Sequence, residues 1–189
     1  SHRRSRPDAF LRCQKVPYSP VADERRRVQS SGYLLRRQTT LFLTSMQAIQ
    51  YSRYGGPDVL NIVDLPNPIP AQDEALIAVK AASVIPGDWK VRAGHLQEMF
   101  PLNLPTIPGR DGAGIVVATG PGCDWAAIGD ELCFVTEHVK PGSYAEMVAR
   151  PRSMTVSKPA EISFPQAAAM MHAGVCAWIG LIETARIKS

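Results

Sequence analysis

Three charged side chains stand close together in the segment Pro86-Gly-Asp-Trp-Lys-Val-Arg92. Asp88, Lys90 and Arg92 place one carboxylate and two cations within five residues, directly after an apolar run that predicts a buried strand. If the backbone is extended there, Lys90 and Arg92 lie on the same face. The segment is then either a polar cluster at the end of a strand, able to orient a ligand, or an ordinary solvated loop.

The thiol and imidazole groups are few, and their spacing is not that of a metal site. The cysteines are Cys13, Cys123, Cys133 and Cys176, and the histidines are His2, His95, His138 and His172. Because no C-x-x-C pair occurs, we predict no zinc site, and cysteines this sparse suit a reducing compartment. His172 and Cys176, taken alone, are interpreted as a hydrogen-bonded helix histidine and a packed core thiol.

Gly112-Ala-Gly114 matches the first half of the dinucleotide-binding pattern G-x-G-x-x-G, but position 117 is Val. The two glycines also precede a Val-rich strand, whereas the fingerprint needs a strand, a turn and then a helix N-terminus. We therefore predict a glycine-rich bend before a strand and no phosphate-binding turn at this position.

A mainly β architecture must position these residues. Short apolar runs alternate with Gly- and Pro-rich turns, which is typical of a small, partly open β-barrel. The predicted strands cover residues 46–51, 59–64, 75–82, 115–118, 131–135, 144–148 and 154–156.

One helix is predicted, from Ser163 to about Glu183. Ser163 and Gln166 form a capping box, and Pro165 fits the first helical turn. Residues 167–182 are apolar except His172, so we expect the helix to be buried on nearly all sides, partly by something outside these 189 residues. The apolar stretch is shorter than the roughly 20 residues of a membrane span, so no membrane insertion is expected.

Charge divides the chain near residue 45. Residues 1–45 hold 10 Lys/Arg and 3 Asp/Glu, a net +7, and residues 46–189 hold 11 and 14, a net −3. The first segment has no lasting helical or strand period, so we predict a disordered basic tail. It is either sequence upstream of a domain that begins at Met46, an organelle transit peptide, or a nucleic-acid-binding arm. No paired aromatic residues accompany the arginines, so no nucleic-acid partner is expected.

Several motifs follow one another in a fixed order: Gly55-Gly-Pro-Asp-Val-Leu60, residues 81–94, residues 105–116, Gly142-Ser-Tyr-Ala-Glu-Met-Val148 and the capped helix from Ser163. Together they resemble the medium-chain dehydrogenase/reductase superfamily, in its zinc-free quinone reductase branch. The resemblance implies a GroES-like catalytic barrel over residues 46–162. It also implies a domain-junction helix over residues 163–189, which a nucleotide-binding domain would follow.

The same resemblance implies hydride transfer from NADPH to a quinone or enone, and roles for six residues. The catalytic candidates are Ile85, Asp88 and Arg92. The cofactor-binding candidates are Lys90, His172 and Cys176. Ile85 stands where many relatives have Asn, and Cys176 where a Thr commonly touches the nicotinamide. Arg110-Asp111 stands where zinc enzymes of the superfamily have His-Glu, so no zinc is expected.

The resemblance also sets expectations for the behaviour of this polypeptide. Without a nucleotide-binding domain, we expect it alone neither to bind NADPH tightly nor to reduce quinones. An uncovered helix face would favour self-association, so a homo-oligomer is compatible with the sequence. We expect a cytoplasmic location, or an organelle if residues 1–45 are a targeting segment. The alternative function is a non-catalytic GroES-like barrel module that binds a protein partner.

Overall fold

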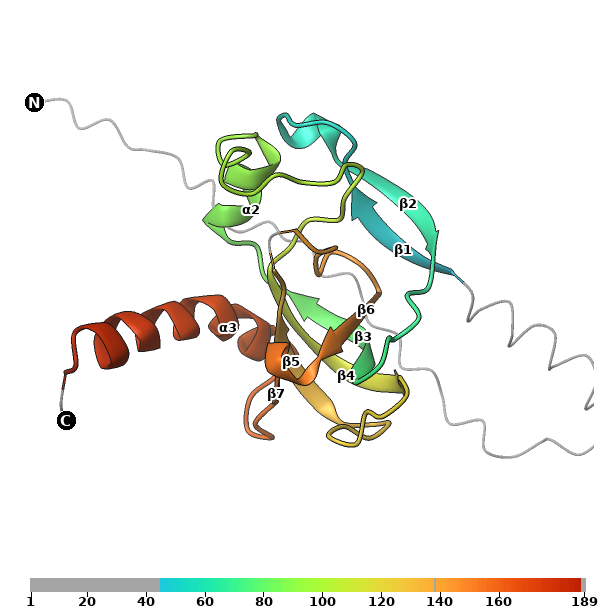
Figure 1. The fold of residues 1–189 in the computed structure, drawn as a ribbon, viewed down its shortest axis with the longest axis vertical. Coiled ribbons are helices and arrows are strands. Elements are labelled where there is room, and N and C mark those ends of the chain that lie inside the picture. The colour runs from blue at the N-terminus through green and yellow to red at the C-terminus, as the bar shows by residue number, and fades with distance from the viewer. Residues whose placement is uncertain (1–44, 138, 188–189) are drawn as a thin grey trace, which may run out of the picture.

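The computed structural model describes residues 45–137 and 139–187, so the predicted tail lies outside the described residues except for Ser45. In the described part, β1 (Ser45–Gln50) pairs antiparallel with β2 (Asn61–Pro66), and a larger antiparallel sheet has the order β6-β3-β4-β5-β7. The strands of the larger sheet are β3 (Glu74–Ala82), β4 (Asp111–Thr119), β5 (Glu131–Val135), β6 (Met147–Pro151) and β7 (Thr155–Ser157). This sheet is curled into a half-barrel (Figure 1), which confirms the predicted mainly β, partly open barrel.

The alternation of side chains along β3 explains where the core lies. Ala75 and Ile77 are completely buried, and they pack with Val116 of β4 and Phe134 of β5. The pairing of β3 with β4 shifts register twice, between Leu76 and Ile77 and between Val79 and Ala81. Such irregularities increase local twist and bend a strand, which is how an open sheet curls around a core.

Two local expectations are wrong. The segment after β3 is not extended but forms a short helix, α2 (Pro86–Arg92), because Pro86 suits the first helical position and Asp88 caps the helix start. The glycines of Gly112-Ala-Gly114 lie inside β4 rather than in a bend before it. A Cβ on Gly114 would lie 2.2 Å from the Ala78 carbonyl oxygen, so the close approach of β3 requires glycine there.

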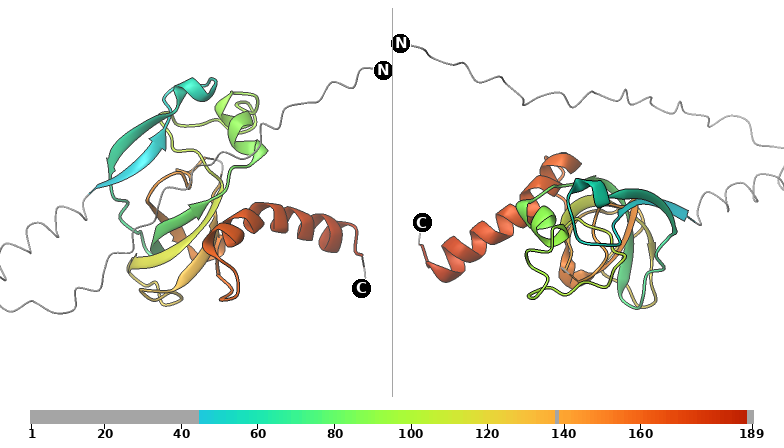
Figure 2. Two further views of the ribbon diagram at one scale, coloured as in Figure 1. Left: turned by 180° about the vertical axis from the view of Figure 1, so that it is seen from behind. Right: turned by 90° about the horizontal axis from the view of Figure 1, so that it is seen from above.

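The predicted helix is present as α3 (Phe164–Trp178), which continues into the π-helical segment η3 (Ile179–Thr184). Its capping box is confirmed, because the Gln166 N–H donates to Ser163 Oγ and the Ser163 N–H donates to Gln166 Oε1. The expected burial on nearly all sides is found only near the start, where Ala167 and Ala168 are buried against Ala113 and Cys133. The rest of the helix points away from the sheet in both views of Figure 2.

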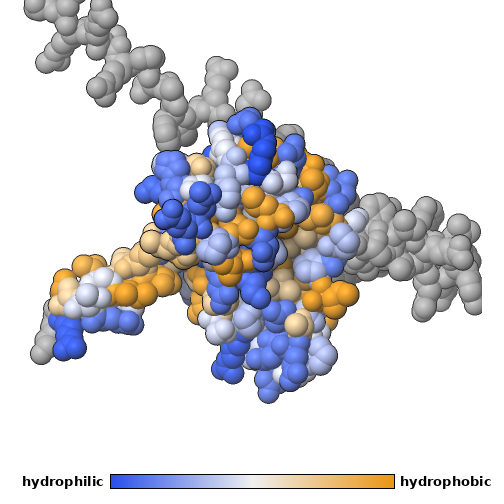
Figure 3. Space-filling view, turned by 45° about the horizontal axis from the view of Figure 1, so that its top comes forward, coloured by the Kyte–Doolittle hydropathy of each residue, from blue (hydrophilic) through white to orange (hydrophobic). Residues whose placement is uncertain are grey.

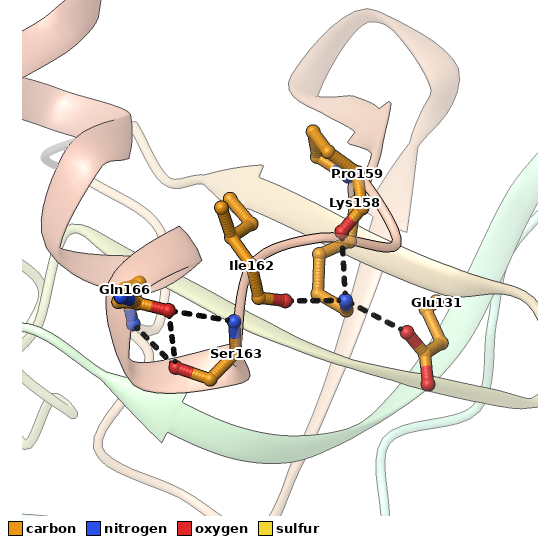
Figure 4. A network of polar contacts seen from close by, with 6 residues as sticks. All are labelled: Glu131, Lys158, Pro159, Ile162, Ser163 and Gln166. Atoms are coloured by element: carbon orange, nitrogen blue, oxygen red, sulfur yellow. Dashed lines mark hydrogen bonds and ion pairs between the residues drawn. The ribbon is translucent and has the colours of Figure 1, made fainter.

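A buried lysine fixes the start of α3. Lys158 Nζ lies 2.9 Å from the Glu131 carboxylate at the beginning of β5, and it also donates to the carbonyl oxygens of Pro159 and Ile162 (Figure 4). Only 4% of its side chain is exposed, and its ammonium lies 5.2 Å from the Phe164 ring centroid. These contacts, together with the capping box, determine the direction in which the helix leaves the sheet.

The exposed part of α3 and η3 is apolar. Figure 3 shows hydrophobic surface along this projecting helix. The exposed large apolar side chains of α3 and η3 are Met170, Val175, Trp178, Ile179, Leu181 and Ile182. Within residues 45–137 and 139–187, one helical stretch, Phe164–Thr184, is long and apolar enough to cross a membrane, a property of its length and composition alone. The expectation that the chain does not enter a membrane stays a prediction.

Candidate functional site

Asp88 holds α2 in place. Its Oδ2 accepts hydrogen bonds from the backbone N–H of Ile85, at 2.9 Å, and from the hydroxyl of Tyr144, at 2.8 Å. The first bond caps the N-terminus of α2, and the second ties α2 to the segment just before β6, 56 residues away. Because Asp88 is only 5% exposed, it is a positioning carboxylate in this structure rather than a group free in solvent.

Burial dominates the electrostatics around Asp88. It raises the pKa of the Asp88 carboxyl, although the hydrogen bonds from Ile85 and Tyr144 and the charge of Arg110 act in the opposite direction. Burial also raises the pKa of the Tyr144 hydroxyl and lowers the pKa of the Arg110 guanidinium to about 10. Both side chains therefore keep their protons at neutral pH, and Tyr144 remains the donor to Asp88.

Lys90 and Arg92 have different surroundings. Lys90 is exposed, with its ammonium 5.9 Å from the ring centroid of Trp89. Arg92 Nε donates to the Gly55 carbonyl oxygen at 3.3 Å, and the Gly55 N–H donates back to the Arg92 carbonyl oxygen. The predicted common face depended on an extended backbone, and residues two apart on a helix do not face each other. Lys90 is thus available to a ligand, while Arg92 fixes the turn before β2.

Asp111 joins the two parts of the site. Its carboxylate is completely buried at the start of β4; Oδ1 accepts the Ser83 hydroxyl, and Oδ2 accepts the His172 backbone N–H at 3.0 Å. Ser83 lies three residues before α2, and His172 lies in α3. One buried carboxylate therefore fixes the residues leading into α2 relative to α3.

His172 and Cys176 form a pair on α3. Their Nε2 and Sγ atoms are 3.7 Å apart, one helical turn along the same face. Cys176 is exposed, so its interpretation as a packed core thiol is wrong. Among the three cysteines that the structure describes, the buried one is Cys133, and burial raises the pKa of its thiol. The difference arises because α3 leaves the sheet after its second turn.

The six candidates from the sequence thus occupy two places. Ile85, Asp88, Lys90 and Arg92 lie on or beside α2, and His172 and Cys176 lie on α3. Sequence reasoning missed Ser83, Tyr144 and Asp111 as the groups that hold these places together. Asp111 stood out only as part of the pair replacing His-Glu, and Tyr144 only as part of a motif, because neither has a local pattern that reveals a distant partner.

Some of the described side chains have the chemistry of cofactor ligands. The exposed ammonium of Lys90 suits a phosphate or carboxamide oxygen, and the His172–Cys176 pair offers hydrogen-bonding groups on α3. Residues 45–137 and 139–187 contain no glycine-rich turn between a strand and a helix N-terminus, and no group of three or more potential metal ligands. The described residues can thus form one wall against a dinucleotide, in which Lys90 suits a phosphate oxygen.

A larger hollow lies elsewhere. A groove of about 670 Å³ runs between the β1–β2 pair and β6, and its lining includes Met46, Leu65, Met147 and Arg150. None of the six candidates lines this groove, whereas Asp88 lines a small cavity beside α2.

Comparisons with known proteins agree with this architecture. Residues 71–160 match the family described as alcohol dehydrogenase GroES-like domain. A spinach protein named "Quinone-oxidoreductase homolog, chloroplastic" is 40% identical over 144 residues, which cover 76% of this chain and 44% of that protein. The chain therefore spans less than half the length of this relative.

Two solved structures resemble the described fold closely. The quinone oxidoreductase from Coxiella burnetii superposes with a TM-score of 0.69 at 32% identity, covering 77% of this chain and 46% of that one. A mycobacterial protein solved in complex with NADPH gives a TM-score of 0.68 at 33% identity, covering 76% of this chain and 42% of that one.

Proposed function

Because the chain belongs to the medium-chain dehydrogenase/reductase superfamily, in its quinone oxidoreductase-like branch, we propose that it acts in the NADPH-dependent, zinc-independent reduction of quinones or enones. The 40% identity over 144 residues to the spinach quinone-oxidoreductase homologue carries this proposal. The NADPH complex of the mycobacterial neighbour supports the choice of cofactor. When bound, NADPH supplies the hydride; the protein supplies orientation and electrostatics.

Each candidate residue has a proposed task in that reaction. Lys90 places a positive charge against the cofactor, and the His172–Cys176 pair flanks it from α3. Asp88 orients α2 through its bonds to Ile85 and Tyr144. Arg92 secures the turn at Gly55. Ile85 contributes an apolar side chain where a polar one would bind substrate, which favours less polar substrates.

We further propose that the 189-residue polypeptide is inactive alone, because the described residues offer only one wall for a dinucleotide. The test joins this chain to the part of the spinach relative that the 144-residue match leaves uncovered, and compares this fusion with the chain alone. NADPH oxidation is measured with a quinone and with an enone. We expect activity from the fusion only. Turnover by the chain alone would overturn the proposed inactivity, and a folded, NADPH-binding fusion without turnover would overturn the proposed function.

A matched pair of lysines tests the site within that fusion. Lys90→Ala removes the exposed ammonium on α2, and Lys80→Ala removes an exposed ammonium on β3. Loss of one charge-assisted hydrogen bond predicts a roughly tenfold lower kcat/KM for Lys90→Ala. Lys80→Ala should keep the parent value. Equal values for the two variants would contradict the role of Lys90.

The exposed apolar helix favours a second candidate function, a non-catalytic module that binds a protein partner through α3 and η3. The fusion experiment separates the two functions, because a non-catalytic module gives no turnover with any quinone or enone even when NADPH binds.

For location, the chloroplastic assignment in the name of the spinach relative favours the organelle alternative over the cytoplasm. We propose that the arginine-rich residues 1–45 direct the chain to a plastid. Import of the chain into isolated chloroplasts, with loss of the N-terminal segment, is the expected result. Equal import of a chain beginning at Met46 would contradict a targeting role for residues 1–45.

A further inference from the structure

A small cavity lies between α2 and the segment that leads into β4. It has a volume of about 20 Å³, and its lining includes Tyr51, Asp88, Val91, Thr106, Arg110 and Lys140. A single water molecule needs about 10–15 Å³ of this kind of space and two to four polar partners. The cavity therefore has room for one water.

Two residues of this lining each have a buried polar atom without a partner in the described part of the chain. Asp88 uses Oδ2 for both of its hydrogen bonds, and its Oδ1 has no partner among the described residues. The Nε of Arg110 is also unpartnered. One atom is an acceptor and the other a donor, and an unsatisfied buried polar atom costs about 1–3 kcal/mol. A water can satisfy both at once, because it accepts and donates.

Charge points to the same arrangement. Asp88 and Arg110 carry opposite charges and act on each other, since the Arg110 cation lowers the pKa of Asp88 and the Asp88 anion raises that of Arg110. Yet they form no direct ion pair within 4 Å among the described contacts. A bridging water connects such a pair without further movement of either chain segment.

We propose that this cavity binds one water molecule, which accepts a hydrogen bond from Arg110 Nε and donates one to Asp88 Oδ1. Arg110 is thereby a positioning residue: through the water it fixes the carboxylate that caps α2, and hence the helix that carries Lys90. The proposal concerns the folded chain and its solvent, so it does not depend on the proposed function.

The test follows the titration of the Asp88 carboxyl by NMR of its ¹³Cγ signal, assigned by its loss in Asp88→Asn. The other charged or titratable groups around Asp88 are Tyr51, Arg92, Arg110, Asp111, Lys140 and Tyr144. Arg110→Met should raise the pH at the midpoint of the Asp88 titration. Arg152→Met, at an exposed position in η2 (Arg152–Met154), should leave it unchanged. An unchanged midpoint in folded Arg110→Met would overturn the positioning role.

A second variant separates the water from the charge of Arg110. Val91→Leu adds one methylene to the cavity lining to exclude the water, and a crystal structure of the variant verifies that the water is absent and that Arg110 stays in place. We expect the same upward movement of the Asp88 midpoint. If Val91→Leu leaves the midpoint at its original value, Arg110 acts by charge alone and the water bridge is wrong. A crystal structure of the unchanged chain gives a check without any variant: electron density within hydrogen-bond distance of both atoms is expected, and its absence overturns the proposal.

Discussion

Two regions of the molecule show the reverse of the usual distribution of polar and apolar residues. One is the polar cluster beside α2, which contains Asp88 and Asp111, and the other is the outer half of α3. In the polar cluster, the charged side chains of Asp88 and Asp111 are buried. Along the outer half of α3, large apolar side chains such as Trp178 are exposed. Buried charges are normally paired or hydrogen-bonded, and exposed apolar patches normally mark contact surfaces. The comparison teaches that the buried polar residues hold two elements together, whereas the apolar side chains along the outer half of α3 are left uncovered by the described residues.

The largest expected effect contrasts two aromatic residues. Phe134 is completely buried in the half-barrel core, whereas Trp178 is 60% exposed. Phe134→Ala should lower the free energy of unfolding by about 3–5 kcal/mol, because it removes packing and leaves a cavity. Trp178→Ala should change it by less than about 0.5 kcal/mol. Urea denaturation measures both, and similar losses would mean that α3 is packed in solution.

The next largest effect on stability is expected at Asp111, whose carboxylate accepts hydrogen bonds from Ser83 and from His172 of α3. Asp111→Ala leaves the Ser83 hydroxyl and the His172 N–H without their acceptor, so we expect a loss of about 1–3 kcal/mol. The His172 amide should also exchange its hydrogen faster. Asp64→Ala, at an exposed position in β2, is the matched control and should alter neither quantity. If the hydrogen exchange rate of the His172 amide is unchanged in Asp111→Ala, the contacts at the N-terminus of α3 alone hold the helix against the sheet.

A pH-dependent effect is expected at Asp88. Burial raises its pKa in the folded state above the unfolded value, so the folded chain binds this proton more tightly. Ionisation of Asp88 therefore removes stability as the pH rises through the folded-state pKa. Asp88→Asn lacks this titration, so its stability relative to the unchanged chain should improve between about pH 4 and about pH 7. Urea denaturation at both pH values measures the difference, and a constant difference would contradict the raised pKa.

The smallest effect on stability is expected on the outer face of α3. Ile182→Glu should change the free energy of unfolding by less than about 0.5 kcal/mol. It should nevertheless reduce self-association, measured by sedimentation, and reduce the binding of a hydrophobic dye. Ser157→Glu, at an exposed position in β7, adds the same charge elsewhere and should do neither. If the unchanged chain is monomeric and does not bind the dye, the exposed face of α3 does not drive self-association.

Local patterns predicted much of this fold. The strand at 131–135 and the cap at Ser163 are confirmed because alternation and capping depend on neighbours in sequence. Burial of α3 was not predictable in the same way, since an apolar composition is compatible with either a core or an uncovered surface. At the site, Asp88 could be selected from its charge and position. Its partner Tyr144 could not, because a contact across 56 residues follows from the curl of the sheet.

The contacts of Lys158 have a mechanical consequence. The continuous helical stretch Phe164–Thr184 contains 21 residues, which at the α-helical rise is roughly 30 Å. Lys158 lies at the base of this helical stretch, where it contacts Glu131 of β5 and the carbonyl oxygen of Ile162, just before the helix begins. A rotation of about 10° there would carry the far tip through about 5 Å over such a length. Lys158, the capping box and the bond from His172 to Asp111 therefore set the direction of α3 together, and a small change in these contacts would become a large displacement at Trp178.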